Sequence, residues 1–473
     1  MNKYKVLLKN TAIFTISNFS SKFLVFLMLP IYTRVMTTAD FGKADLIITT
    51  VSLLMQIFTF CVADGALRFA LDKQHDNKQV FTFGLKVIFI GFLMLILSYP
   101  ILIKIDIIKN YIVFFYLLYI TSAISNYFNQ FVRGIEKVKL IGIVGIISTI
   151  VTVGSNLLFL VIFKFGVNGY IISNILMNIA SMIILFYYGR LYKYFYSGIF
   201  EKKFKKEMNE YNIPLIPNRI NWWAIMISDR YIVNYFCGAT AVGIVSVANR
   251  IPTIIITIYG VIQQALLISV ISEYDKNDNE VFFGRIYNFM NIVLLFAVSF
   301  LILIVKPLSS LLFGSKFYVA WQLVPLLSVA ILFGALHGFL TTIFSAVKQT
   351  KILLYNSIIG AVISIIFNFI LIPILGIIGS SFASLLTYFI VWVMLLYSSR
   401  KYVKFPINLL SDFTCYFIIL FQAIFVSYIN SRIVYLVSVI SIVLIFVVKY
   451  KQLSQMAYLF KNAIFKKIHG RKN

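Results

Sequence analysis

Residues 213–251 read IPLIPNRINWWAIMISDRYIVNYFCGATAVGIVSVANRI. The stretch is apolar and long enough to cross the hydrocarbon core of a bilayer, which a helix of ~20 residues spans. It nevertheless carries Arg219, Asp229, Arg230 and Arg250. A charge at the centre of a membrane helix costs roughly 2.5 to 3.5 kcal/mol on insertion scales, so such residues mostly face a water-filled cavity or one another. The stretch, which follows the longest basic loop, therefore predicts the hinge between the two halves of a membrane transporter.

The composition is that of a polytopic membrane protein. Of the 473 residues, 61% are hydrophobic and 12% are charged, whereas a soluble protein is about 25% charged. The formal net charge is +26, but the basic residues lie in short gaps between apolar segments, which indicates membrane topology rather than nucleic-acid binding. Cys61, Cys237 and Cys415 are embedded in apolar segments, so we expect no disulfide framework.

About fourteen apolar runs have the length of a membrane helix. They are residues 11–32, 46–66, 81–103, 111–131, 140–163, 167–188, 213–235, 242–271, 281–305, 321–347, 352–375, 377–396, 410–428 and 434–448. The predicted fold class is therefore an all-α integral membrane protein. Its predicted parts are an N-terminal six-helix lobe (1–188), a basic cytoplasmic loop (189–212), a C-terminal six-helix lobe (213–398), two additional helices (399–448) and a basic cytoplasmic tail (449–473).

The gaps between the predicted helices alternate in charge. One set is rich in lysine and arginine and includes both ends of the chain, whereas the other holds only isolated basic residues such as Arg34. Because basic loops stay in the cytoplasm, we expect both termini to be cytoplasmic. Segments 189–212 and 453–473 mix aromatic residues with lysines. They are either ordinary topological anchors or amphipathic helices that lie on anionic membrane lipids.

An internal repeat relates the two halves, at offsets of about 200 to 212 residues. Lys139, Asn156 and Gly166-Val-Asn-Gly169 are answered by Lys351, Asn368 and Gly376-Ile-Ile-Gly379, and Phe41-Gly42 is answered by Val242-Gly243. A repeat of six helices has an even number of spans, so both copies keep the same orientation. We therefore expect an axis along the membrane normal to relate the two lobes, with the last two helices outside the repeat.

The first predicted helix carries a polar stripe. Thr11, Thr15, Asn18 and Lys22 are spaced four, three and four residues apart, which places them on one helical face. Lys22 lies about midway through the span, too deep to reach water easily by snorkelling. We expect Asn18 and Lys22 to face a polar cavity; an interhelical hydrogen bond with no role in transport is the alternative.

The second predicted helix ends with Asp64 and Arg68, at positions i and i+4. They form either a local intrahelical ion pair or two separate functional groups. In the second case Arg68 meets a phosphate near the cytoplasmic face, and Asp64 is a candidate for ion coupling.

The stretch quoted at the outset places its charges on defined faces. Arg219 and Arg230 are eleven residues apart, so they stack on one helical face ~16 Å apart. Asp229 shares the face of Asn218, and Asn218 and Asn221 are candidates for lining a polar cavity. An aspartate beside an arginine serves either as a structural counter-ion or as a proton carrier, and both interpretations of Asp229 stay open.

Two further features of this stretch have alternative explanations. Arg250 lies just before Pro252, which can kink a helix and open its hydrogen-bond ladder towards a cavity. Trp222 and Trp223 either stack on a sugar or lie at a membrane interface, where tryptophan is common.

Several catalytic signatures are missing from the sequence. It contains no GxxxxGK[ST] and no HExxH motif, so neither a P-loop nor a zinc protease site is supported. The sixteen acidic residues are scattered, which disfavours a carboxylate-bound metal catalyst. One intramembrane aspartate with backbone carbonyls would still suffice to hold Na⁺. We expect no cofactor and no enzymatic activity.

The chain resembles bacterial polysaccharide biosynthesis flippases of the multidrug/oligosaccharidyl-lipid/polysaccharide exporter superfamily, whose fold is MATE-like. The resemblance rests on the duplicated six-helix unit, on Leu29-Pro-Ile-Tyr32-Thr-Arg34 followed by Phe41-Gly42, and on Pro217-Asn-Arg-Ile-Asn-Trp-Trp223 with Ser228-Asp-Arg-Tyr231. It implies a monomeric protein of the bacterial cytoplasmic membrane. Such a protein moves an undecaprenyl-pyrophosphate-linked O-antigen or capsule repeat unit to the outer leaflet by alternating access.

A pyrophosphate needs cations to cross a low-dielectric core. The cationic candidates are Lys22, Arg34, Arg68, Arg219, Arg230 and Arg250. The likeness also implies a polysaccharide polymerase and glycosyltransferases as partners, and coupling to a proton or sodium gradient, between which no residue decides.

Three alternatives remain at this stage. A flippase for the lipid-linked peptidoglycan precursor shares the helix plan and the cationic cavity. A multidrug antiporter of the same superfamily binds cations, for which a basic cavity has the wrong sign. A membrane glycosyltransferase or polysaccharide polymerase needs catalytic acids in an external loop, where Asp40 and Asp106 are the main candidates.

Overall fold

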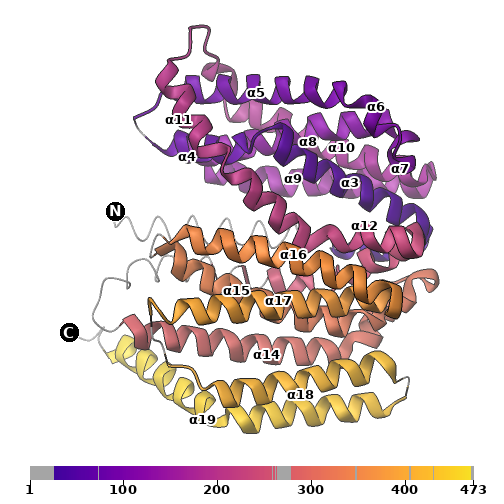
Figure 1. Cartoon of the computed structure of the whole chain (residues 1–473), viewed down its shortest axis with the longest axis vertical. Coiled ribbons are helices and arrows are strands. Elements are labelled where there is room, and N and C mark those ends of the chain that lie inside the picture. The colour runs from indigo at the N-terminus through magenta and orange to yellow at the C-terminus, as the bar shows by residue number, and fades with distance from the viewer. Residues whose placement is uncertain are drawn as a thin grey trace. The chain divides into compact units, whose positions relative to one another are not determined.

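The structure is a computed structural model of the whole chain (Figure 1). It describes residues 26–72, 74–257, 259, 260, 263, 279–346, 349–403, 406–429 and 431–469. Every regular element in these ranges is a helix. Asn18 and Lys22, with the rest of the predicted polar stripe, lie outside the described residues.

The described helices fall in two groups along the chain. The first group is α2 (Leu29–Val35), α3 (Thr38–Phe58), α4 (Val62–Leu71), α5 (Asn77–Leu97), α6 (Tyr99–Leu102), α7 (Asp106–Lys109), α8 (Ile112–Gly134), α9 (Val138–Asn156), η1 (Leu157–Ile162), α10 (Gly166–Tyr188), η2 (Leu191–Tyr194), α11 (Lys202–Asn212) and α12 (Leu215–Ala248). The second is α14 (Asn279–Leu312), η3 (Ser315–Gln322), α15 (Val324–Ala346), α16 (Thr350–Leu375), α17 (Ile377–Ser399), α18 (Leu409–Tyr428) and α19 (Ile433–His469).

The all-α membrane fold is confirmed. Within the described residues, twelve helical segments are long and apolar enough to cross a membrane. One of them, Lys202–Ala248, contains the predicted span 213–235 and the start of the predicted span 242–271. Most of the predicted span 11–32 lies outside the described residues. The protein is therefore a multi-pass membrane protein close to the predicted number of spans.

The repeat is visible in the local geometry of two helical hairpins, α9–α10 and α16–α17. Asn156 and Asn368 are buried, and each donates its side-chain amide to the carbonyl four residues earlier at 2.8 Å. Gly166 and Gly376 begin the following turns with φ of +53° and +61°. Side chains rarely adopt this backbone conformation, which explains why both copies of the repeat keep a glycine there.

The chain divides into two compact units. Unit 1 comprises Met1–Val247 with Leu312–Tyr318, and unit 2 comprises Ala248–Leu311 with Val319–Asn473. This division follows packing within each unit, whereas the predicted lobes follow the sequence repeat. The lobe limits therefore stay a prediction.

The core of unit 1 forms around α8, which packs against α4, α5 and α10. The phenol of Tyr127 is fully enclosed and donates to the carbonyls of Val80 and Phe81 at 2.8 and 3.0 Å. Its ring lies against Gly84, where a built Cβ would be 2.2 Å from the phenol oxygen. A glycine in α5 thus makes room for an aromatic residue of α8.

Helix α11 packs on the protein with its apolar face. Phe204 and Met208 are buried, and the Phe204 ring contacts those of Phe69 and Phe83. Lys203 and Lys206 are exposed on the other side. Within the basic segment 189–212, the apolar face of α11 is therefore occupied by α4 and α5.

Lys137, between α8 and α9, contacts the start of this basic segment. Its ammonium donates to the carbonyl of Gly189 at 2.6 Å. Partial burial, together with the charges of Arg190 and Lys193, lowers the pKa of Lys137. Several cations therefore lie close together at this end of unit 1.

In unit 2, polar contacts join α14 to α18. Asn291 donates to Asp412 at 2.8 Å, and Ser299 and Gln422 exchange two hydrogen bonds at 2.6 and 3.0 Å. Figure 1 shows α18 and α19 as an antiparallel hairpin. The charge pattern placed Lys449 at the start of a basic tail, but its side chain is fully buried in α19 and pairs with Asp412. The predicted tail therefore begins inside the packed helix.

Candidate functional site

Asp64 and Arg68 lie in α4, directly after a break that separates α4 from α3. Phe60 and Cys61 both have positive φ, 50° and 53°, a left-handed conformation uncommon for residues with a side chain. The chain therefore ends α3 and restarts as α4. Asp64 lies in the first turn of α4 and Arg68 in its last.

Arg219 of α12 binds Asp64 with two hydrogen bonds. Its Nη2 lies 2.7 Å from Oδ1, and its Nε lies 3.2 Å from Oδ2. The Arg219 side chain is 50% exposed and that of Asp64 is 21% exposed. The carboxylate of Asp64 is thus paired across two helices. Arg68 is exposed and has no ion pair or hydrogen bond within the part of the chain that the structure describes.

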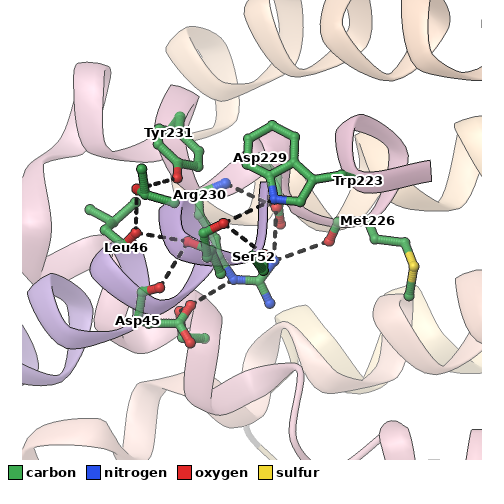
Figure 2. A network of polar contacts seen from close by, with 11 residues as sticks. Asp45, Leu46, Ser52, Trp223, Met226, Asp229, Arg230 and Tyr231 are labelled. Carbon is green, nitrogen blue, oxygen red and sulfur yellow. Dashed lines mark hydrogen bonds and ion pairs between the residues drawn. The ribbon is translucent and has the colours of Figure 1, made fainter. Parts of the chain in front are cut away.

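A second, buried network surrounds Arg230 (Figure 2). Its Nε donates to Asp45 of α3 at 2.8 Å, and its Nη1 lies 3.2 Å from Asp229 and 3.0 Å from the carbonyl of Met226. Ser246, from the end of α12, donates to the same Asp45 oxygen at 2.7 Å. Two carboxylates therefore flank one guanidinium, and the side chains of Asp45, Asp229 and Arg230 are only 8% to 13% exposed. The attraction between them offsets part of the cost of burying three charges.

Aromatic residues extend this network along α3. The indole of Trp223 donates to the carbonyl of Thr49 at 3.1 Å, and its ring lies 5.3 Å from that of Tyr231. The phenol of Tyr231 lies 2.7 Å from the Thr50 hydroxyl. The half-buried Trp223 is thus fixed to α3 by its indole hydrogen bond, and its two interpretations stay predictions.

The part of α12 before the non-helical Gly238 runs antiparallel to α3 and α4. The pairs Asp45–Arg230 and Asp64–Arg219 follow in opposite order along the two chains, and Asn212 continues the series by approaching Gly65. The eleven residues between Arg219 and Arg230 correspond to ~16 Å. Each arginine therefore reaches a different acid along one helical face, as the predicted stacking requires.

The structure places the other predicted residues as follows. Asn218 and Asn221 are half-buried on α12, and Arg34 is exposed at the end of α2. Each of the three interacts with other residues. Arg250 belongs to unit 2, where its carbonyl accepts a hydrogen bond from Thr253. In the described part of unit 1, the structure thus brings together Asp64 with Arg219, and Asp229 with Arg230.

Sequence reasoning missed Asp45, Thr50 and Ser246. Asp45 lay just before the predicted span 46–66 and was therefore not considered an intramembrane acid, although α3 begins at Thr38. A rule that flags every acid within one turn of an apolar run would have found Asp45. No sequence pattern around Thr50 or Ser246 distinguishes them from other hydroxyl residues in apolar segments.

A search of the described residues finds no group of three or more histidine, cysteine or acidic side chains arranged to hold a metal ion.

The family description "Polysaccharide biosynthesis protein" matches residues 7–275, more than half of the chain. The chain belongs to the polysaccharide biosynthesis protein family. The match covers all the residues of both arginine-centred sites, so these are features of a polysaccharide biosynthesis protein. No curated protein matches the chain.

Solved structures share the fold of this polysaccharide biosynthesis protein. One is described as "Lipid II flippase MurJ, inward closed conformation", with a TM-score of 0.70, 16% identity and coverage of 93% of this chain and 99% of that chain. A second, "Crystal structure of MATE in complex with MaL6", has a TM-score of 0.61, 13% identity and coverage of 83% and 95%. A third, an outward-facing multidrug resistance MATE transporter, has a TM-score of 0.60, 14% identity and coverage of 83% and 95%. At these identities the likeness establishes the fold.

Proposed function

We propose that the protein flips a polyprenyl-pyrophosphate-linked oligosaccharide repeat unit from the cytoplasmic to the outer leaflet by alternating access. The family and the flippase and transporter structures of the same fold support a lipid-linked substrate. We further propose the bacterial cytoplasmic membrane as its location, with both termini in the cytoplasm. Glycosyltransferases would act before it, and a polysaccharide polymerase would act after it.

The observation that carries this proposal is the pair of the half-exposed Arg219 with Asp64, one helical turn from the exposed Arg68. A pyrophosphate offers the same paired oxygens that Asp64 offers, with more charge, and a guanidinium binds both groups through two parallel hydrogen bonds. The headgroup would displace Asp64 from Arg219 and gain Arg68 as a second cation. Both arginines lie at the ends of their helices that the charge pattern assigns to the cytoplasm, where the substrate is made.

Arg230 has a different role in this proposal. Asp45, Asp229 and the Met226 carbonyl already occupy its donors, so a pyrophosphate would have to compete with two buried carboxylates. We assign Arg219 and Arg68 to the headgroup and the Asp45–Arg230–Asp229 network to coupling. A proton taken up by Asp229 would remove its charge and weaken its hold on Arg230.

The test is flipping of a fluorescent polyprenyl-pyrophosphate glycan in proteoliposomes that contain the purified protein. Arg219→Gln should lower the rate about 10- to 100-fold, because a hydrogen bond to a charged group contributes about 1.5 to 3 kcal/mol. Lys203→Gln removes an 84%-exposed positive charge on α11 and is the matched control, with an unchanged rate. Equal rates for wild type, Arg219→Gln and Arg68→Gln would exclude this headgroup site.

A second candidate substrate is the lipid-linked peptidoglycan precursor. It is favoured by the structural likeness to a protein described as a lipid II flippase. Both substrates share the pyrophosphate, so Arg219 cannot separate them. Competition in the same proteoliposomes can separate them. If the unlabelled precursor slows flipping of the labelled oligosaccharide only at great excess, the repeat unit is the substrate. If the precursor competes as well as the unlabelled oligosaccharide does, the precursor is supported.

A further inference from the structure

Two lysines from different helices of unit 1 share one aromatic ring. The ammonium of Lys86, in α5, lies 4.6 Å from the centre of the Phe200 ring, and that of Lys205, in α11, lies 5.8 Å from the same centre. A cation within about 6 Å of a ring centre is attracted to the face of the ring. Two like charges therefore converge on one place, and the headgroup site proposed above uses neither of them.

The loop between η2 and α11 holds the shared ring against α5. The hydroxyl of Thr82 donates to the carbonyl of Tyr194 at 3.3 Å and accepts from the backbone N–H of Tyr196 at 2.8 Å. Phe200 is 7% exposed, and its ring lies 5.7 Å from that of Phe83, at a steep angle to it. The position of the ring between the two lysines is therefore fixed by contacts on both sides of the chain.

The lysines of α11 fall into two kinds. Lys203 and Lys206 each pair with the glutamate four residues later, at 4.0 and 3.7 Å. Lys205 forms no ion pair or hydrogen bond with any described residue, although Glu201 precedes it by four positions, and the same holds for Lys86. An ammonium carries three donors and no acceptor. Lys86 and Lys205 thus present donors that an anion from outside the protein can satisfy.

The surroundings of Lys86 are apolar and exposed. Helix α5 is long and apolar enough to cross a membrane. Phe89, Ile90 and Leu93 follow Lys86 on the same helical face and are 60%, 53% and 45% exposed. Lys86 lies nine residues into α5, ~14 Å along its axis, and a lysine on such a face extends its ammonium towards the lipid headgroups. The nearby Ile199 in the loop is 91% exposed, so the loop also offers an apolar side chain at this level.

We propose that Lys86 and Lys205, with the Phe200 ring between them, bind the phosphate of an anionic phospholipid whose acyl chains run along the exposed face of α5. Charge complementarity accounts for the phosphate, and the apolar face that continues from Lys86 accounts for the chains. A soluble phosphate would use the two cations but not this face. The lipid would bridge α5 and α11 and so fasten the basic segment 189–212. This site goes beyond the proposed flipping of a glycan and does not depend on it.

The binding mode differs from that of an amphipathic helix lying on the membrane. The apolar face of α11 is already occupied by α4 and α5, through the buried Phe204 and Met208. Helix α11 therefore contributes a lysine rather than its apolar face to the lipid. The exposed Ile199 and the face of α5 supply the apolar contact instead.

The test measures which lipid gathers at Ile199. A bimane fluorophore is attached to Ile199→Cys in protein whose exposed Cys237 is replaced by serine, in phosphatidylcholine nanodiscs that contain increasing fractions of doxyl-labelled phosphatidylglycerol. Half-maximal quenching should occur at a lower fraction of doxyl-phosphatidylglycerol than of doxyl-phosphatidylcholine. Lys86→Gln and Lys205→Gln should each raise the fraction of phosphatidylglycerol needed about fivefold, as expected for one lysine near an anionic lipid.

The matched control is Lys203→Gln, which removes a positive charge from the same helix but one that is paired with Glu207. It should leave the quenching curve unchanged. Three results would overturn the proposal. The first is equal quenching by the two lipids in the wild-type sequence, and the second is a preference that survives in Lys86→Gln with Lys205→Gln. The third is loss of the preference in excess inorganic phosphate, which would mean that the lysines bind a soluble anion.

Flipping distinguishes this lipid site from the substrate site. In vesicles of phosphatidylcholine alone, Lys86→Gln with Lys205→Gln should flip the fluorescent glycan at the wild-type rate. Slower flipping there would assign the two lysines to the substrate and overturn the lipid site. Protein that prefers phosphatidylglycerol but flips no glycan would support the lipid site and reject the proposed function.

Discussion

Replacing Lys449 by methionine is predicted to destabilise the protein strongly. The Lys449 side chain is 0% exposed and that of Asp412 is 1% exposed. Removing the lysine leaves Asp412 with only the 2.8 Å hydrogen bond from Asn291 on one carboxylate oxygen. The other oxygen, Oδ2, is buried without a hydrogen-bond partner in the described structure. Breaking a buried ion pair on one side costs about 3 to 5 kcal/mol, because the remaining charge is uncompensated.

The assay is reversible unfolding of the purified protein in mixed micelles of increasing SDS content, followed by tryptophan fluorescence. Lys449→Met should lose about 3 to 5 kcal/mol. Lys451→Met, two residues further on and exposed, should stay within about 0.5 kcal/mol of wild type. The double replacement Asp412→Leu with Lys449→Met should recover most of the loss, because neither charge remains.

Two results would refute this reasoning. Equal stabilities of Lys449→Met and Lys451→Met would mean that the ion pair is not buried in the folded protein. If the double variant loses as much stability as Lys449→Met and Asp412→Leu lose together when measured singly, Asp412 and Lys449 act independently.

Two further predictions follow from unit 1. Gly91→Ala should lower stability by about 1 to 3 kcal/mol in the same assay, because the added Cβ would lie 1.9 Å from the Phe58 carbonyl oxygen. Gly154→Ala is the control and should not destabilise the protein, because a Cβ there has open space. A larger loss of stability for Gly154→Ala than for Gly91→Ala would contradict the packing of α5 on α3. Asp229→Asn should make flipping independent of an imposed proton gradient while Arg219 still binds the headgroup. This is checked by comparing rates with and without the gradient, and an undiminished response would remove Asp229 from coupling.

Features encoded in neighbouring residues were predicted from the sequence. Apolar runs of bilayer length gave a multi-pass helical protein, because a membrane helix satisfies its own backbone hydrogen bonds whatever surrounds it. The repeat was visible because Asn156 and Asn368 each bond to their own helix. Gly166 and Gly376 both meet a backbone requirement for positive φ. Such constraints act within a few residues and therefore leave a mark in the sequence.

The choice of charge partners was decided only by the tertiary structure. Asp64 has Arg68 one turn away but pairs with Arg219, 155 residues later, and Arg230 reaches an unpredicted acid, Asp45. Lys449 was counted with a basic tail and is buried against Asp412. Spacing in sequence fixes which side of a helix a charge occupies. It does not fix which helix faces that side, because this depends on how α12 crosses α3 and α4 and how α19 packs beside α18.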